Sequence, residues 1–123
     1  MIYILVGAGG MAGALLRYIV SIAIAAWWDG SFPLATLAVN YIGCFFLPLL
    51  TLRLKSRLSV PVQKAVTTGI IGSFTTFSTF SVETVSLWET GQAAAALGYV
   101  LLSIVGGLFF TRLGFKKGER LSI

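Results

Sequence analysis

The sequence predicts an all-α integral membrane protein with four transmembrane helices, the third of which is broken within the membrane. Of its 123 residues, 57% are hydrophobic and only 11% are charged, and the mean hydropathy is +0.93. Soluble domains carry about 25% charged residues, so this composition excludes an ordinary soluble domain. The break is predicted by residues 69–81, where six Ser or Thr, three Phe and two Gly interrupt an apolar stretch.

The whole chain, residues 1–123, is expected to form one four-span domain. Each of its four apolar stretches has the roughly 20 residues that a helix needs to cross the hydrocarbon core. The first stretch lacks the basic segment that begins a signal peptide, so we interpret it as a retained span. Four helices of one small subunit are too few to enclose a pathway comfortably, and an oligomer is therefore expected. The stretches cover residues 2–27, 32–54, 60–88 and 92–113.

Eight of the nine basic residues form two clusters, one around the second connection and one after the fourth span. With four crossings both clusters fall on one side of the membrane, and the connections on the other side contain no Lys or Arg. The positive-inside rule then predicts cytoplasmic N- and C-termini in the cell membrane. It also explains the net charge of +5 without a nucleic-acid partner. The clusters are Arg53, Lys55, Arg57 and Lys64, and Arg112, Lys116, Lys117 and Arg120.

The first span combines close-packing glycines with a buried charge. Gly9 and Gly13, four residues apart, form a face on which two helix backbones can approach closely. Arg17 lies well inside the span, where a charge is costly. It either extends its side chain to the interface, forms a structural ion pair, or sets a favourable field for an anion.

Polar residues in the second and fourth spans leave two interpretations open. Asn40, near the centre of the second span, either bonds a neighbouring helix or directs its amide N–H groups at an anion. In the fourth span Tyr99, Ser103, Gly107 and Thr111 recur every four residues, so they share one face. This stripe either relays an anion between hydroxyl donors or packs against another helix.

A helix break in the third span would free backbone carbonyls able to hold a cation. Phe77 and Phe80 are spaced to share a face, and the positive edges of their rings would favour a small anion, with core packing as the alternative. Glu83 is a second embedded charge, either a partner for Arg17 or a vestibule residue. The chain has no His and a single Cys, Cys44, which we interpret as a small buried hydrophobe. With no nucleophile–base pair or metal cluster, an enzyme is not expected.

Three motifs together resemble the Fluc fluoride channels, also called the CrcB family, over essentially the whole chain. The third of them, in the third of four short spans, is the most specific. They are Gly9-Gly10-x-x-Gly13-Ala14-x-x-Arg17-Tyr18, Thr36-Leu37-x-Val39-Asn40-x-x-Gly43, and Gly72 followed by Thr75-Thr76-Phe77-Ser78-Thr79-Phe80-Ser81.

The resemblance implies an antiparallel, dual-topology dimer with two pathways that passively export toxic fluoride from the cytoplasm. It implies a structural Na⁺ at the dimer centre, held by the carbonyls of Gly72 and Thr75 from both subunits, and an acidic residue, Glu83, near the pore mouth. Phe77 and Phe80 would contact fluoride through their ring edges, Asn40 would donate its amide to the ion, and Ser78 and Thr79 would assist. The polar track of the fourth helix would consist of Tyr99, Ser103 and Thr111.

This sequence departs from the family pattern at Ser73, where a second Gly is usual, and at Gly107, where a hydroxyl residue is often found. The charge bias carries a further expectation, because a homodimer of antiparallel subunits needs one sequence to insert both ways. The bias instead predicts a fixed orientation and a heterodimer with an oppositely oriented paralogue. Two rival functions remain: a non-conducting partner subunit, and a small multidrug-type exporter that would need Glu83 as its proton-exchanging carboxylate.

Overall fold

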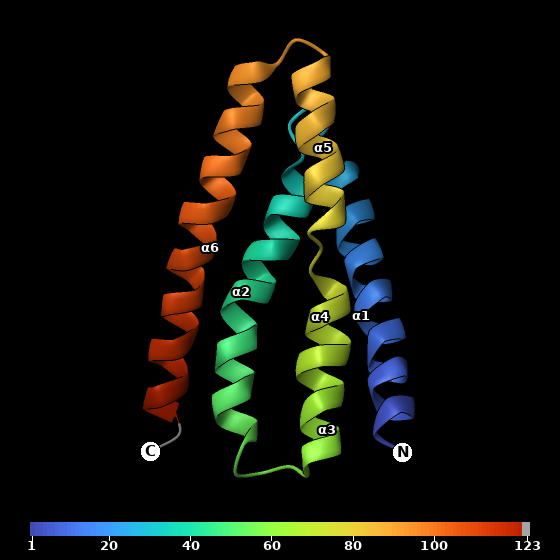
Figure 1. Cartoon of the computed structure of the whole chain (residues 1–123), viewed down its shortest axis with the longest axis vertical. Helices are drawn as coiled ribbons and strands as arrows, with labels where there is room; N and C mark the ends of the chain where they lie inside the picture. The colour runs from blue at the N-terminus through green and yellow to red at the C-terminus, as the bar shows by residue number, and fades with distance from the viewer. Residues whose placement is uncertain (122–123) are drawn as a thin grey trace.

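The computed structural model describes residues 1–121, and this part of the chain contains helices and no strands. Three helices, α1, α2 and α6, are long and apolar enough to cross a membrane. The remaining segments follow one another along a fourth column (Figure 1). The elements are α1 Ile2–Ala25, α2 Leu34–Leu54, α3 Val60–Lys64, the π-helix η1 Ala65–Ile71, α4 Gly72–Phe74, α5 Ser78–Glu89 and α6 Ala93–Leu121.

The fourth column is interrupted between α4 and α5. Thr75 leaves the helix with an extended backbone, φ −78° and ψ 160°, and the helix resumes at Ser78 after Phe77. The interruption therefore falls within residues 69–81, where the sequence predicts it. Below it, η1 is a π-helix, a form that appears mostly as short bulges and frequently near functional sites.

The start of α1, the end of α6 and the α2–α3 connection lie at the same end of the molecule, and the α5–α6 connection lies at the other end (Figure 1). The two basic clusters of the sequence therefore gather at one end. α6 continues to Leu121, beyond the expected end at residue 113. Its last turns remain attached to α2 because Gly118 packs on Leu52, where a Cβ would meet the side chain at 3.0 Å.

Glycine contacts attach α1 to the fourth column. A Cβ at Gly9 would collide with the carbonyl of Ala65, and a Cβ at Gly13 with the carbonyl of Ile70. Only glycine permits this approach of α1 to η1, so the predicted close-packing face of the first span is confirmed. A Cβ at Gly10 would meet the Ser73 hydroxyl at 3.1 Å, which shows that the Ser73 side chain faces α1.

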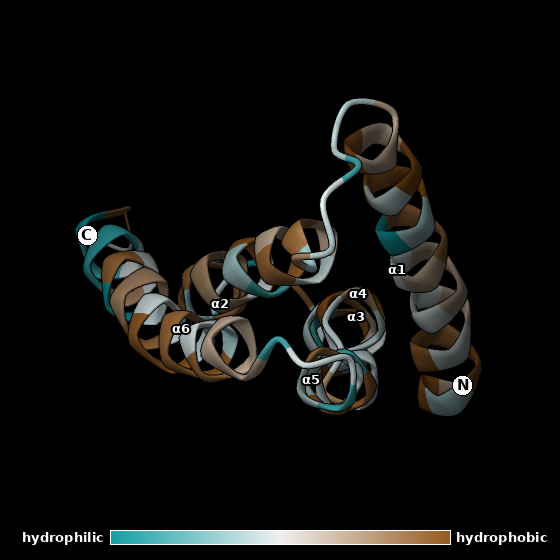
Figure 2. Ribbon diagram, turned by 90° about the horizontal axis from the view of Figure 1, so that it is seen from above, coloured by the Kyte–Doolittle hydropathy of each residue, from teal (hydrophilic) through white to brown (hydrophobic). Residues whose placement is uncertain are grey.

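Viewed from above, α2 and α6 form one side of the molecule, α1 forms the other, and the column of α3, α4 and α5 stands between them (Figure 2). This arrangement is open. The accessible surface is 7902 Å², against about 6,400 Å² for a compact soluble monomer of the same mass. Large apolar side chains cover much of that surface, from Tyr3 on α1 to Phe109 on α6. A single subunit thus leaves apolar faces for lipid or for another chain.

Candidate functional site

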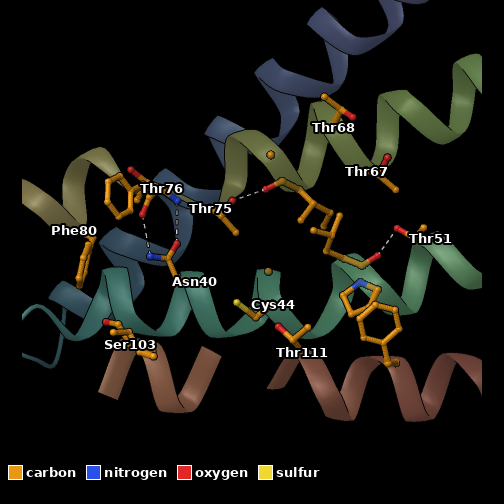
Figure 3. A pocket seen from close by; sticks show the side chains of 18 of the residues that line it. Asn40, Cys44, Thr51, Thr67, Thr68, Thr75, Thr76, Phe80, Ser103 and Thr111 are labelled. Carbon is orange, nitrogen blue, oxygen red and sulfur yellow. Dashed lines mark hydrogen bonds between the residues drawn. The ribbon is translucent and has the colours of Figure 1, made fainter. Parts of the chain in front are cut away.

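The helix break is held by Asn40 of α2. Its Nδ2 donates to the Thr76 carbonyl at 2.9 Å, and the Thr76 amide donates to its Oδ1 at 2.9 Å. This pair of bonds satisfies both backbone groups of a residue that lies outside any helix (Figure 3). The Asn40 amide group has two N–H donors, so one N–H remains for a further acceptor.

Two carbonyls lose their helical partners at the break. In a continuous helix the Thr76 amide would bond the Gly72 carbonyl, but here it donates to Asn40. The Thr79 amide would bond the Thr75 carbonyl, but here it donates to the Thr76 hydroxyl at 3.2 Å. Gly72 and Thr75, the two residues whose carbonyls the sequence resemblance assigns to Na⁺, are thus deprived of these backbone donors.

Three aromatic rings follow one another from the break toward α6. Phe77 is 79% exposed, and its ring centroid lies 5.8 Å from that of Phe80. Phe80 meets the fully buried Tyr99 edge-on at 5.0 Å. The two Phe rings therefore lie together as the spacing predicts, but only Phe80 is fixed by packing within the subunit.

Glu83 accepts hydrogen bonds from two other helices. The Thr36 hydroxyl donates to its Oε1 at 2.6 Å and the Tyr99 hydroxyl to its Oε2 at 3.1 Å. The carboxylate thus joins α2, α5 and α6, and both of its oxygens are engaged by hydroxyl groups. Of the alternatives for Glu83, the structure gives no ion pair with Arg17 within residues 1–121.

A cavity of about 1040 Å³, hereafter the groove, lies between α2, the α3–α4 column and α6 (Figure 3). It brings together seven of the residues that the sequence singles out, while Arg17, Ser78, Thr79, Glu83 and Tyr99 do not line it. Cys44 lines it too, so this thiol is a wall of the groove and not a buried core residue. The predicted residues in its lining are Asn40, Gly72, Thr75, Phe77, Phe80, Ser103 and Thr111.

A smaller cavity of about 310 Å³ contains the half-buried Arg17. The hydroxyl-bearing residues that line it with Arg17 are Tyr18, Ser21, Thr36, Thr76 and Thr79. Thr79 thus belongs to the Arg17 cavity and not to the groove. Thr76 lines both cavities, so both of them reach the break.

Sequence reasoning missed several polar residues of these sites. Thr36 lies four residues before Asn40 and shares its helical face, a signal that could have found it. Lys64, Thr51, Thr67 and Thr68 line the groove, but the basic cluster and ordinary helical hydroxyls conceal them in the sequence. A Cβ at Gly107 would lie 3.6 Å from the Cys44 sulfur, so this thiol faces the gap in the hydroxyl stripe.

Long apolar helices around a hydroxyl-lined groove, with a polar break in one column, define a small helical membrane protein. The chain belongs to the CrcB family, because residues 4–115 match the family model described as "CrcB-like protein, Camphor Resistance (CrcB)".

Three relatives are similar over most of their length, and each is named as an ion channel and not as an enzyme. "Fluoride-specific ion channel FluC 1" of Bacillus cereus is 50% identical, covering 98% of this chain and 85% of the relative. A protein of the same name from Desulfitobacterium hafniense is 50% identical over 90% of this chain and 97% of the relative. "Fluoride-specific ion channel FluC 2" of Listeria innocua is 41% identical over 98% and 93%.

Proposed function

We propose that this chain is a subunit of a fluoride-selective channel, through which fluoride leaves the cytoplasm passively across the cell membrane. The observation that carries the proposal is the break clamped by Asn40, with Phe77 and Phe80 beside it on the wall of the groove. The names of the relatives supply the ion. Loss of fluoride down its gradient would reduce fluoride toxicity.

The groove offers the chemistry that a small, strongly hydrated anion requires. Ring edges carry partial positive charge, and Asn40 keeps one N–H donor beyond its bond to Thr76. Ser103 and Thr111 add hydroxyl donors from α6. Tyr99 contributes differently, because its hydroxyl is engaged by Glu83 and its ring supports Phe80.

A structural Na⁺ fits the backbone of the break. Rings of backbone carbonyls can replace the hydration shell of an alkali cation, and the carbonyls of Gly72 and Thr75 lose their helical donors here. Two carbonyls from each of two subunits would form such a ring at the dimer centre. Depletion of Na⁺ in favour of a large organic cation should lower the melting temperature of the dimer and its fluoride flux. An unchanged melting temperature and flux would refute the Na⁺ site.

The subunit is proposed to work as an antiparallel dimer in which the break lies at mid-membrane depth. The open groove and the exposed Phe77 support a partner that completes the pathway. The grouping of basic residues at one end supports a fixed orientation, with cytoplasmic termini and an oppositely oriented paralogue as partner. Cysteine mapping of the N-terminus in cells should find it on the cytoplasmic side alone. Both orientations would refute the heterodimer.

Liposomes that contain this subunit alone or with its paralogue test the function and the assembly together. Fluoride efflux is expected from the pair and not from the single subunit, and Phe80→Ile should abolish it. Efflux from the single subunit would establish a self-sufficient dual-topology channel. Efflux from the pair that survives the substitution would identify a non-conducting partner subunit, and silence in every case would favour the exporter.

A further inference from the structure

One end of the groove carries a charge that the proposed pathway does not use. Lys64 lines the groove where α3 passes into η1, and among the lining residues it is the one with a charged side chain. Thr51, Thr67 and Thr68 lie at the end of the groove away from Phe80 (Figure 3). Lys64 precedes Thr67 by one turn, so it stands at the outer mouth of that end.

Three donors that line the groove are without partners. Within residues 1–121, no hydrogen bond or ion pair engages the Lys64 ammonium or the hydroxyls of Thr68 and Thr111. The neighbouring Thr51 and Thr67 differ, because each donates to a carbonyl of its own helix, at 2.7 and 2.9 Å. The mouth therefore presents the Lys64 ammonium and the free Thr68 hydroxyl, and the free Thr111 hydroxyl follows deeper in the groove, beside Cys44 (Figure 3).

The charge that lines the groove has one sign. The other seven residues of the basic clusters do not line the groove, and no carboxylate lines it. Glu83, in the segment beyond the break, is engaged by Thr36 and Tyr99. A cleft with low-dielectric walls focuses the field of its charges and raises the local concentration of the opposite ion. A lone ammonium at such a mouth attracts anions.

We propose that Lys64, with the neighbouring hydroxyl of Thr68, forms an anion-capture site at the mouth of the groove, which concentrates small monovalent anions of the halide class and leads them toward Thr111. The site's role in transport rests on the proposed function, but anion attraction does not. An ammonium acts as a point charge, so capture does not distinguish fluoride from chloride. Discrimination is left to the ring edges deeper in the groove.

The native Cys44 provides a sensor for this field, because it lines the same groove and is the single cysteine of the chain. Its rates of modification by an anionic and by a cationic methanethiosulfonate reagent would be measured in the membrane-embedded protein. The ratio of the two rates reports the potential in the groove. Lys64→Gln removes the proposed charge, and Lys55→Gln is the matched control at the same end, since Lys55 does not line the groove.

At low ionic strength Lys64→Gln should lower the anionic-to-cationic ratio by about two- to tenfold, as expected for one charge at an intermediate dielectric. Lys55→Gln should change the ratio much less. In 1 M salt, where the Debye length is about 3 Å, the difference between the variants should nearly vanish. An unchanged ratio in Lys64→Gln, or an equal change in both variants, would overturn the proposal.

Fluoride flux tests the transport role separately. Lys64→Gln should reduce flux at low ionic strength, in the same direction as the modification ratio, and the loss should shrink in high salt. If the wild-type protein conducts no fluoride but shows the Lys64-dependent ratio, the capture site is supported and the proposed channel function is refuted. If the wild type conducts fluoride and Lys64→Gln conducts equally well at low and at high salt, the role of capture in transport is refuted.

Discussion

Asn40 and Thr76 exchange two hydrogen bonds, each of 2.9 Å, across 36 residues of sequence. One side chain thereby satisfies the backbone of a residue that no helix supports. Unpaired backbone groups are particularly costly in a membrane, where irregular backbone is tolerated only when protein buries it or it lines a pathway. The polar break and the second span are therefore one structural unit.

Replacement of Asn40 should damage both stability and function. Asn40→Ala leaves the Thr76 amide and carbonyl without these partners, at a cost of about 1–3 kcal/mol for each buried group left unsatisfied. Asn40→Asp keeps the acceptor but loses the donor, so its melting temperature should lie between that of Asn40→Ala and that of the wild type. Thr84→Val is the control, because its hydroxyl bonds only a carbonyl of its own helix. A wild-type melting temperature for Asn40→Ala would contradict the clamp.

Two glycines of the first helix should respond oppositely to alanine. A Cβ at Gly13 collides with the Ile70 carbonyl, whereas a Cβ at Gly7 meets nothing within 4 Å. Gly13→Ala should lower stability by about 1–3 kcal/mol through overpacking, and Gly7→Ala should be neutral or gain up to about 1 kcal/mol from helix propensity. Thermal unfolding in detergent measures both. Equal melting temperatures would show that α1 does not depend on this approach to η1.

The Thr36–Glu83 bond should appear as a coupling energy. Thr36→Val and Glu83→Gln each disturb the 2.6 Å hydrogen bond, so the double variant should lose less stability than the sum of the single ones. Residues in one hydrogen-bond network couple by about 0.5–3 kcal/mol. Unfolding of the four proteins of the cycle gives the value. Strict additivity would mean that the two side chains act independently.

Substitutions of Phe77 and Phe80 should both change fluoride flux, but only the substitution of Phe80 should change the stability of the subunit. Phe77 is mostly exposed in the subunit, and Phe80 packs on Tyr99. Phe77→Ile is expected to reduce fluoride flux while the unfolding of the isolated subunit hardly changes. Phe80→Ile should abolish flux and also cost about 1 kcal/mol, the value of an aromatic pair beyond its buried area. Equal stability losses from both substitutions would contradict the difference in packing.

The helices were largely predictable because bilayer thickness constrains their lengths. The small-residue spacing of Gly9 and Gly13 also identified the contact face of α1. The run of Ser, Thr and Gly indicated a break within residues 69–81. Its location after Phe74 could not be derived locally, because it depends on Asn40 in another helix.

The site was less predictable for the same reason. The Glu83 carboxylate is engaged by Thr36, 47 residues earlier, and by Tyr99, 16 residues later, and no periodicity reveals such pairs. In the sequence Lys64 is one of several basic residues that indicate the membrane orientation, and only the fold shows that it lines the groove. Side-chain chemistry was visible in the sequence, but its grouping around two cavities required the structure.

The most direct test of the central claim is an electrode measurement of fluoride released from proteoliposomes loaded with potassium fluoride. This subunit would be reconstituted with its paralogue, and valinomycin would be added to let potassium follow. Passive, electrogenic conduction predicts negligible release before valinomycin and rapid release after it, without a proton gradient and with chloride retained. Release that requires a proton gradient, or no release of fluoride at all, would contradict a fluoride channel.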